Sequence, residues 1–304
     1  MSSKNIVKCI LCDMDGVLRI GSYPIQGVQN IFSYFKELKI QPIIITNECR
    51  YTNNKIYSDL KHMNIIKDTS IPLITSANVC KTWLENYIYT NKSKYSCFNV
   101  CTIGEKGLQE NIKLIQSTNL HITHKYNSQK NTKNIIILGC LFNYTENHRK
   151  IIKEWLSQNT LIVKTCDDYS DPESNCILPN DILENFKCSA DINVGKPDKN
   201  FSREVDKILK EKNLSQTKPE EILLIGDTMN TDIKMGKKLG YKTILVLSGN
   251  TKINDLKGYA YSPDYILPSI EYIKTMLNHL LVSASTAVSP EDSESFGSTC
   301  SARI

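Results

Sequence analysis

Short apolar runs alternate with segments of helical spacing along most of the chain, and this alternation limits the fold more than any other feature. The runs are bounded by polar residues and contain many β-branched side chains, which is typical of strands buried on both faces of a parallel sheet. Strands separated by helices build open α/β sheets. We therefore predict a Rossmann-like, doubly wound parallel sheet built from the two ends of the chain. Its expected elements are strands at 6–12, 40–45, 221–225 and 243–247 and helices at 27–39 and 231–239.

The segment between these two halves has an alternation of its own and is long enough to form an inserted α/β domain. Two linkers, near 75–77 and 190–194, would join the domains as a hinge. The expected elements of the segment are strands at 71–75, 99–103, 134–138 and 161–165 and helices at 78–89 and 146–157. The predicted domains are a core in two parts at 1–75 and 191–282, an α/β cap at 76–190, and a Ser-rich tail at 283–304 that we expect to be disordered.

Charge and composition exclude several classes of protein. The 304 residues carry 37 Lys and Arg against 32 Asp and Glu, and the net charge of +5 is small for a dedicated nucleic-acid binder. No apolar run approaches the roughly 20 residues needed to cross a bilayer, and the N-terminal residues lack the pattern of a secretory signal. We expect a soluble, cytoplasmic protein with no nucleic acid and no membrane as its partner.

Eleven cysteines raise the question of disulfides, but the number is odd and no secretory signal precedes them. We interpret them as reduced thiols. Cys9 and Cys12 form a C-x-x-C pattern inside the first predicted strand, where positions i and i+3 point to opposite faces. This favours a packing role over a metal site. His121 and His124 are close in sequence without carboxylate or thiol partners, so we expect them at the surface.

Two carboxylates follow the first strand, in Asp13-Met14-Asp15-Gly16-Val17. Ligands of open α/β sheets bind at the carboxyl ends of strands, and residues i and i+2 of an extended segment face the same way. The charges of Asp13 and Asp15 repel each other unless a cation or a shared proton intervenes, and Mg²⁺ has the matching preference for hard oxygen ligands. Gly16 allows a sharp turn that can offer backbone N–H groups to an anion. Taken alone, the motif also fits a plain Asp-rich turn.

Three further segments favour a reactive site over a turn. Thr46-Asn47 ends the second strand and adds a hydroxyl and an amide, and Lys196 adds a cation between a glycine and a proline. Asp227 and Asp232 stand five residues apart where another strand ends and a helix begins. Together these segments supply a carboxylate nucleophile, an acid and base, phosphate-binding donors and metal ligands. These are the parts of a metal-assisted phosphoryl transfer.

The four segments resemble, in their order and their placement at strand ends, the four motifs of the haloacid dehalogenase superfamily of phosphatases. The resemblance implies that Asp13 is the nucleophile that forms an aspartyl-phosphate. It implies that Asp15 is the general acid that protonates the leaving oxygen and later activates water. The phosphate-binding residues that the resemblance implies are Asp15, Gly16, Thr46, Asn47 and Lys196.

The resemblance also implies Mg²⁺ as the cofactor. In this superfamily the ion is held by the side chain of the nucleophile, by the backbone carbonyl two residues further on, and by a carboxylate of the fourth motif. Here these groups belong to Asp13, Asp15 and Asp227, and Asp232 supports the same site.

The position of the insert narrows the resemblance to one subfamily. Only 33 positions separate Asp13 from Thr46, whereas 150 separate Thr46 from Lys196, so the cap lies between the second and third motifs. An α/β cap there, with the motif Gly104-Glu105-Lys106-Gly107-Leu108 inside it, is similar to the para-nitrophenyl phosphatase and NagD-like subfamily. That subfamily usually has Thr-Asn-Asn at its second motif, where this chain has Thr46-Asn47-Glu48. The resemblance implies hydrolysis of a small phosphorylated metabolite such as a sugar, glycolate or nucleotide phosphate.

Several alternatives stay open on the sequence. A phosphotransferase would use the same four motifs, and a non-catalytic phosphometabolite-binding protein could share the fold, although we expect such a protein to lose its acidic residues. Asp167-Asp168-Tyr169 follows a cap strand and is either a substrate-selecting loop or an ordinary acidic turn. Arg19 either contacts a substrate anion or is solvated. A homodimer through the cap is a further expectation.

Overall fold

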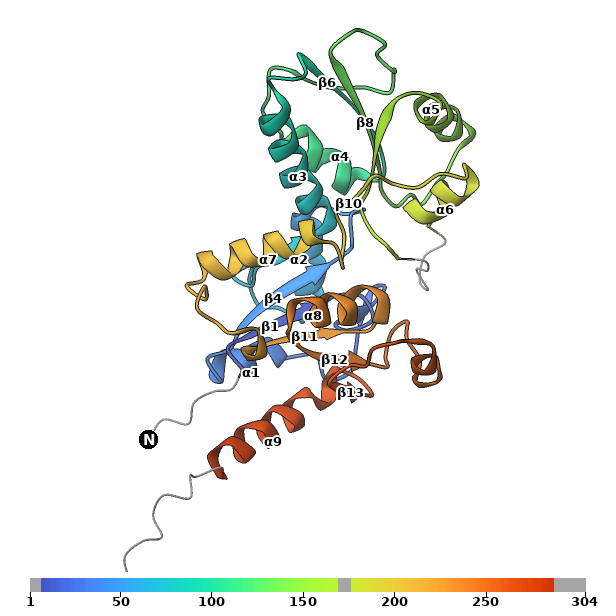
Figure 1. Ribbon diagram of the computed structural model, residues 1–304. Helices are drawn as coiled ribbons and strands as arrows, with labels where there is room; N and C mark the ends of the chain where they lie inside the picture. Colours follow the sequence, from blue (N-terminus) through green and yellow to red (C-terminus); the bar gives the residue numbers. More distant parts are fainter. Residues whose placement is uncertain (1–6, 169–175, 287–304) are drawn as a thin grey trace, which may run out of the picture.

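The computed structural model describes residues 7–168 and 176–286. It contains two parallel β-sheets of different size, drawn one above the other in Figure 1. The smaller sheet comes entirely from the middle of the chain and the larger sheet from the two ends. This arrangement is the predicted α/β class, a doubly wound core with a second α/β unit inserted into it.

The larger sheet has six parallel strands, and its central strands lead into the acidic motifs. β1 lies between β11 and β4, so these three strands end at the same edge of the sheet. In sheet order the strands are β13 (Tyr265–Leu267), β12 (Lys242–Val246), β11 (Ile222–Gly226), β1 (Cys9–Asp13), β4 (Gln41–Thr46) and β5 (Leu73–Thr75). A short ribbon of β2 (Arg19–Ile20) and β3 (Tyr23–Pro24) follows β1.

Alternate residues of β1 serve opposite faces of the core sheet. Cys9 and Leu11 belong to one buried apolar cluster, and Ile10 and Cys12 belong to the other. The two cysteines of the C-x-x-C pattern therefore face opposite sides, as predicted. The first cluster packs against α3 (Ser76–Asn91), α7 (Lys199–Glu211) and α8 (Lys234–Leu239), and the second against α1 (Ile31–Glu37), α2 (Asn53–His62) and α9 (Ile273–Thr286).

The smaller sheet has five parallel strands and a different partner on each face. One face shares the apolar cluster of α3 and α7, so this face is continuous with the core. The other face is closed by two cap helices around the buried Trp155. In sheet order the strands are β10 (Ile192–Asn193), β9 (Thr160–Lys164), β8 (Thr132–Leu138), β6 (Cys97–Ile103) and β7 (Leu120–Ile122). The helices are α4 (Lys106–Lys113) on the first face and α5 (Glu146–Leu156) and α6 (Pro179–Asn185) on the second.

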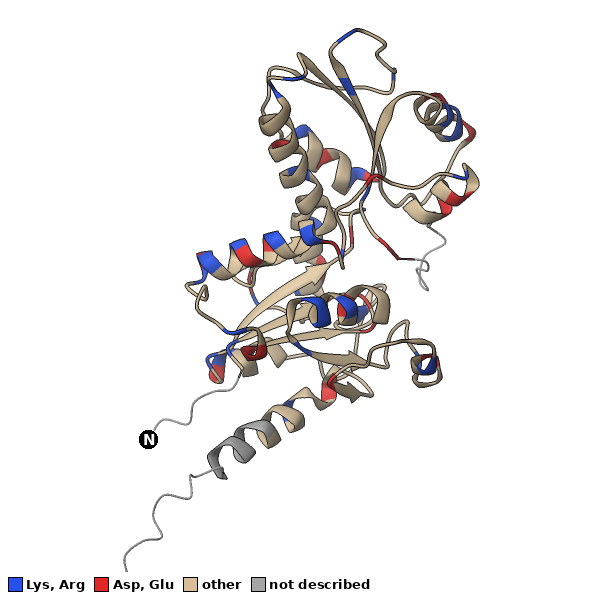
Figure 2. Ribbon diagram, in the orientation of Figure 1, with Lys and Arg blue, Asp and Glu red and all other residues tan. Residues whose placement is uncertain are grey.

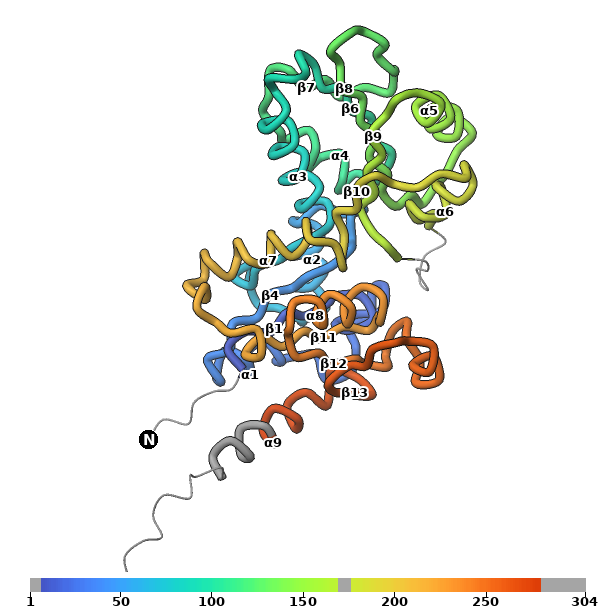
Figure 3. Tube along the Cα trace, in the orientation of Figure 1, coloured from blue at the N-terminus to red at the C-terminus, as the bar shows by residue number. Residues whose placement is uncertain are grey.

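The chain passes between the two sheets twice, first from β5 into α3 and later from β10 back towards α7 (Figure 3). Thr75 caps the first crossing, because its side chain accepts a hydrogen bond from the backbone of Asn78 at the start of α3. At the second crossing β10 pairs with β9. Residues 192–193, which the sequence analysis placed in a linker, thus belong to the smaller sheet. The domain boundaries after 75 and 190 stay predictions.

Two helices differ from their predicted ranges for local reasons. The helix predicted at 27–39 begins only at Ile31, because Gly27 and Asn30 both have left-handed backbone conformations that a helix cannot contain. The helix predicted at 231–239 is divided into a π-helical turn (Met229–Ile233) and α8. Wide turns of this kind are common at functional sites.

The remaining expectations concern surfaces and thiols. Within residues 7–168 and 176–286, none of the helices combines the length and the apolar character that a membrane crossing requires. Basic and acidic side chains are interleaved along α7 (Figure 2). His121 and His124 are exposed, as predicted. The cysteines of the described residues are all free thiols, and most of them are buried.

Candidate active site

Three carboxylates from two strand ends meet around one buried lysine. Asp13 is the last residue of β1, and Asp227 and Asp232 follow β11 directly and in the π-helical turn. Lys196 donates hydrogen bonds from Nζ to Asp13 Oδ1 and to Asp232 Oδ1, both at 2.7 Å. All four side chains are buried. The structure therefore joins the first, third and fourth sequence motifs in one cluster.

Burial and charge both act on this cluster. Burial and the neighbouring Asp232 raise the pKa of Asp13 well above its ordinary value, against the opposing effect of Lys196. The same two causes raise the pKa of Asp227 to about 7. Burial alone would lower the pKa of Lys196, but Asp13 and Asp232 raise it above the ordinary value. The lysine therefore stays charged, and one ammonium faces three carboxylates.

The donor set fits a divalent cation with a preference for hard oxygen ligands. Asp13, Asp227 and Asp232 each offer an oxygen that lies within 4.8 Å of the other two. Such carboxylate oxygens suit Mg²⁺, and a cation would offset the repulsion that raises the pKa of the acids. The side chain of Asp15 is not part of this donor set, because it forms an ion pair with Arg19.

Two glycines leave the space that the Asp227 carboxylate occupies. A Cβ atom on Gly16 would lie 2.5 Å from Asp227 Oδ2, and one on Gly249 would overlap the same atom. The backbone N–H of Asn250 donates to Asp227 Oδ2 at 2.6 Å, which fixes the carboxylate. The N–H of Gly16 is already bonded to the carbonyl of Arg19 at 2.8 Å. Gly16 therefore gives room to Asp227, and its own N–H is not free for an anion.

Gly226, the last residue of β11, makes room for Asp232 in the same way, and this predicts a large effect of one methyl group. We expect Gly226→Ala to lower the free energy of unfolding by about 1–3 kcal/mol or more, because its Cβ would overlap Asp232 Cβ at a rigid strand end. The matched control is Gly258→Ala, where a Cβ meets nothing within 4 Å. Urea unfolding of both variants measures the difference. Equal stability of the two would contradict the packing described here.

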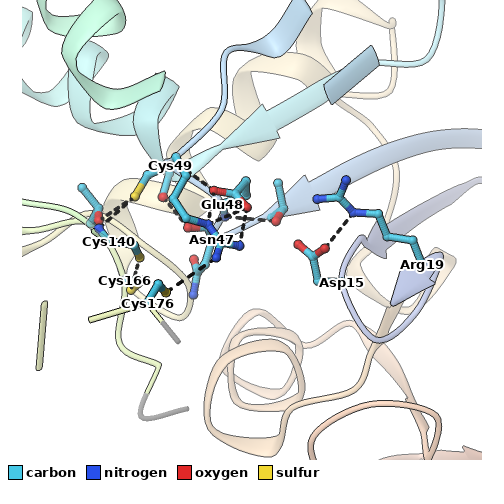
Figure 4. A network of polar contacts seen from close by, with 12 residues as sticks. Asp15, Arg19, Asn47, Glu48, Cys49, Cys140, Cys166 and Cys176 are labelled. Atoms are coloured by element: carbon cyan, nitrogen blue, oxygen red, sulfur yellow. Dashed lines mark hydrogen bonds and ion pairs between the residues drawn. The ribbon is translucent and has the colours of Figure 1, made fainter. Parts of the chain in front are cut away.

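Arg19 is neither solvated nor free. It is buried, and its Nε donates to Asp15 Oδ1 at 2.8 Å. The Asp15 side chain keeps about a third of its surface exposed (37%) and lies on the wall of a cleft. Of the two sequence alternatives for Arg19, solvation is wrong. The arginine holds the carboxylate of Asp15 in place beside the cleft (Figure 4).

The second motif connects the core, the lysine loop and the cap. Asn47 Oδ1 accepts a hydrogen bond from the backbone N–H of Lys196 at 2.7 Å, and Asn47 Nδ2 donates to Asp168 Oδ2 at 2.9 Å. Thr46 Oγ1 accepts from the backbone N–H of Glu48 at 3.0 Å. This bond uses an oxygen lone pair, so the hydroxyl proton of Thr46 remains available as a donor.

Glu48, which departs from the subfamily pattern, holds Arg50 at a contact between core and cap. Its buried carboxylate accepts from Arg50 Nε at 3.0 Å and from Arg50 Nη2 at 2.6 Å. The guanidinium of Arg50 lies 5.1 Å from the centre of the Phe142 ring, which belongs to the cap. Nearby, the N–H of Gly107 in the cap motif donates to the carbonyl of Arg50 at 2.8 Å. A Cβ on Gly107 would collide with the Tyr51 backbone, which explains a glycine at this position.

A cleft of about 610 Å³ lies between core and cap. Its wall includes Asp168 but not Asp167, which forms an ion pair with Lys164 at 2.5 Å. Burial raises the pKa of Asp168 to about 6. Tyr169, the third member of the predicted loop, lies outside the described residues. The site residues that line the cleft are Asp13, Asp15, Gly16, Thr46, Asn47, Asp168, Lys196 and Asp227.

Sequence reasoning missed the segment after β12. Ser248 Oγ donates to the carbonyl of Gly16 at 2.7 Å, and Gly249 and Asn250 enclose Asp227 as described above. A signal was present, because a serine, a glycine and an asparagine follow a predicted strand at the same edge of the sheet where the acidic motifs lie. The pairing of Glu48 with Arg50 and the contacts of Asn47 left no comparable signal.

Comparisons with known proteins agree with this geometry. The family model described as haloacid dehalogenase-like hydrolase matches residues 10–117, and a second HAD-hydrolase-like model matches residues 193–273. The chain is 24% identical over 268 residues to the sugar-phosphatase AraL of Bacillus subtilis, which covers 86% of this chain and 90% of that protein. It is 39% identical over 61 residues to the ribonucleotide monophosphatase NagD of Escherichia coli, which covers 20% of this chain and 24% of that protein.

Solved structures share the fold over nearly the whole chain. NagD from Escherichia coli K-12 superimposes with a TM-score of 0.69 at 21% identity, covering 87% of this chain and 97% of that one. The p-nitrophenyl phosphatase from Archaeoglobus fulgidus gives a TM-score of 0.67 at 20% identity, covering 90% and 99%. The first family model covers the first part of the core and continues into the inserted unit, and the second begins at the end of that unit. Together the two models contain all four motifs that meet at the buried lysine. Both parts of the chain that carry these motifs therefore match models of haloacid dehalogenase-like hydrolases.

Proposed function

We propose that the protein is a Mg²⁺-dependent phosphomonoester hydrolase that acts on a small phosphorylated metabolite through an aspartyl-phosphate intermediate. The observation that carries this proposal is the cluster of Asp13, Asp227, Asp232 and Lys196 at the strand ends, open to a cleft on the side of Asp13. An anionic nucleophile attacks a phosphate only where cationic groups offset the repulsion between the two. The cluster combines such a nucleophile with a buried ammonium and with oxygen ligands for a cation.

Each residue has a separate task in the proposed reaction. Asp13 attacks phosphorus, and the P–O bond to the leaving group breaks in the same step. Asp15, held by Arg19, gives a proton to the leaving oxygen and afterwards takes one from the attacking water. The water oxygen bonds to phosphorus as the P–O bond to Asp13 breaks, which frees the Asp13 carboxylate and releases inorganic phosphate. Lys196 and the hydroxyl of Thr46 donate hydrogen bonds to the phosphoryl oxygens. When bound, Mg²⁺ would be held by Asp13, by Asp227 and by the Asp15 carbonyl, and it would supply charge neutralisation.

The expected substrate is small. On the cap side, the cleft is lined by Phe142, Cys140 and Asp168, and this enclosure favours a compact ligand over a polymer. Relatives are named for a sugar phosphate, a ribonucleotide and p-nitrophenyl phosphate, which supports the same class. A phosphotransferase would use the same residues, and product analysis with an added acceptor alcohol separates the two reactions. A cytoplasmic location and a homodimer through the cap stay predictions.

We expect EDTA to abolish turnover of p-nitrophenyl phosphate and added Mg²⁺ to restore it. The physical reason is the repulsion among three buried carboxylates that a single lysine does not offset. A steady-state assay after chelation and after titration with Mg²⁺ measures the effect. Turnover that persists in chelator would show that the assigned metal role is wrong.

We expect Asp168→Ala to change the order in which phosphorylated substrates are ranked by kcat/KM. Its carboxylate lies on the cap side of the cleft and is bonded to Asn47, so it is placed to meet the part of the substrate beyond the phosphate. Asp167→Ala is the matched control, because Asp167 is bonded to Lys164 away from the cleft wall. Turnover of a small aryl phosphate should change less, by about tenfold at most. An unchanged ranking in Asp168→Ala would overturn the selecting role.

A further inference from the structure

We propose that Cys140 and Cys166 form a dithiol that a hydroperoxide entering the substrate cleft oxidises to a disulfide, which lowers turnover at the neighbouring site. The two sulfur atoms are 3.9 Å apart in the reduced protein. A third sulfur, that of Cys49 from the core, lies beside them and accepts hydrogen bonds from the backbone N–H of Cys140 and from Thr165 Oγ1, both at 3.4 Å. Figure 4 shows these thiols at one end of the polar network that reaches Asn47.

The backbone positions suit a disulfide. Leu138 and Lys164 are the last paired residues of β8 and β9, and the N–H of Thr165 continues the ladder to the carbonyl of Leu138 at 3.0 Å. Cys140 and Cys166 each lie two residues beyond that last pair, in the segments that follow these two neighbouring strands. Adjacent strands are about 4.8 Å apart, which is within the range of roughly 4.4–6.8 Å that disulfides span between Cα atoms. Forming the bond therefore needs movement of the side chains and of the segments that follow the two strands, with little movement of the sheet.

The two thiols differ in their access to the cleft. Cys140 lies on the wall of the cleft and keeps a small exposed fraction, 6%, whereas Cys166 is almost completely enclosed. A small peroxide can thus reach Cys140 by the same route as the substrate. The neighbouring thiols and burial raise the pKa of Cys140. The hydrogen bond with Cys140 lowers the pKa of Cys166, but burial outweighs it and the pKa of Cys166 is raised as well. The pair therefore stays reduced until the oxidant is abundant.

The chemistry needs only the two thiols and the peroxide. One sulfur attacks a peroxide oxygen, the O–O bond breaks, and a sulfenic acid forms while the other oxygen leaves as water or an alcohol. The second sulfur then attacks the sulfenic sulfur, the S–O bond breaks, and the hydroxyl leaves as water with the thiol proton. The two sulfurs together lose two electrons, and the peroxide gains them.

The disulfide would act on the site through contacts that are already in place. A Cβ on Gly195 would lie only 2.7 Å from Cys166 Cα, so the lysine loop packs directly against the backbone of Cys166. Two residues after Cys166, Asp168 is bonded to Asn47, which in turn holds the N–H of Lys196. Drawing the sulfurs from 3.9 Å to the length of about 2.05 Å of a disulfide shifts this segment. We expect Lys196 to lose its alignment with Asp13 and turnover to fall.

The test treats the full chain with hydrogen peroxide in a buffer with EDTA. The protein is then unfolded in the presence of iodoacetamide, which alkylates free thiols, and is digested and analysed by mass spectrometry. We expect a peptide pair linked through Cys140 and Cys166 that dithiothreitol separates. Cys166→Ala and Cys140→Ala must both lack it. Cys101→Ala is the matched control and must retain it, because Cys101 is equally buried in β6 but faces the opposite side of that sheet. The proposal would be overturned if the half-buried Cys97 were oxidised while Cys140 and Cys166 both stayed reduced and were therefore alkylated.

Activity provides the second readout. After return to Mg²⁺, oxidised wild type should have at least several-fold lower turnover of p-nitrophenyl phosphate, and dithiothreitol should restore it. Cys166→Ala should keep its own activity through the same treatment. A linked peptide without any change in turnover would overturn the effect on the site. This effect rests on the proposed function, but the mass readout does not depend on phosphatase activity, so the two failures are distinguishable.

Discussion

Asp13→Asn is expected to remove turnover of every phosphomonoester, by roughly 10⁴-fold or more, which corresponds to a loss of about 5 kcal/mol in transition-state stabilisation. An amide at the end of β1 has nearly the shape of the carboxylate and keeps an oxygen for the hydrogen bond from Lys196 Nζ. It cannot, however, attack phosphorus as an anion. The fold should therefore survive while the reaction stops. Steady-state kinetics with several substrates measures the loss.

Asp167→Asn is the matched control for this variant. It makes the same chemical change at a carboxylate bonded to Lys164 outside the cleft wall, and it should keep nearly the activity of the wild type. Circular dichroism and urea unfolding show whether Asp13→Asn is folded. Substantial turnover in folded Asp13→Asn would mean that another group is the nucleophile.

Lys196→Met should have the second large effect, on stability as well as on activity. Lys196 is bonded to both Asp13 and Asp232, and its side chain is almost completely buried. Removing one partner of a buried ion pair leaves uncompensated charge and typically costs about 3–5 kcal/mol. We expect a decrease of this size in the free energy of unfolding in EDTA. Mg²⁺ should recover part of it, because a bound cation can neutralise the same carboxylates.

The control for this prediction is Lys8→Met, which removes an ion pair of similar length at the surface. Lys8 Nζ lies 2.9 Å from Glu221 Oε1, but nearly half of the lysine side chain is exposed (46%). Exposed pairs contribute less than about 1 kcal/mol, so this variant should unfold close to the wild type with and without Mg²⁺. Equal stability of the two methionine variants in EDTA would contradict the buried charge balance described here.

The parallel strands were predictable because a strand buried on both faces must be almost entirely apolar, and β1, β4 and β11 are. The residues at their ends were predictable for the same reason, since polar side chains stand out after such runs. Helix ends were less predictable. The start of α1 depends on the left-handed backbone of Gly27 and Asn30, which a helical spacing of apolar residues does not reveal.

Side-chain partners distant in sequence were beyond prediction. Asn47 binds Asp168 and Lys196 at separations of 121 and 149 positions. The first contact exists only once the cap is folded over the core, and the second only once the two parts of the core are joined. The cysteines of the dithiol follow two cap strands whose register no sequence pattern fixes. Arg19 was left undecided because its ion pair with Asp15 depends on the turn at Gly16, whose backbone folds β2 back onto the motif.

Trapping the intermediate shows whether Asp13 carries the phosphoryl group during turnover. The Asp15→Asn variant should slow the attack of water, so acid quenching during turnover with Mg²⁺ and an aryl phosphate should preserve the acyl phosphate. Borohydride then reduces an aspartyl-phosphate to homoserine, which mass spectrometry locates in the peptide. We expect homoserine at position 13 and at no other aspartate. Steady release of phosphate with Asp13 unmodified, or homoserine at Asp227 or Asp232 instead, would contradict it.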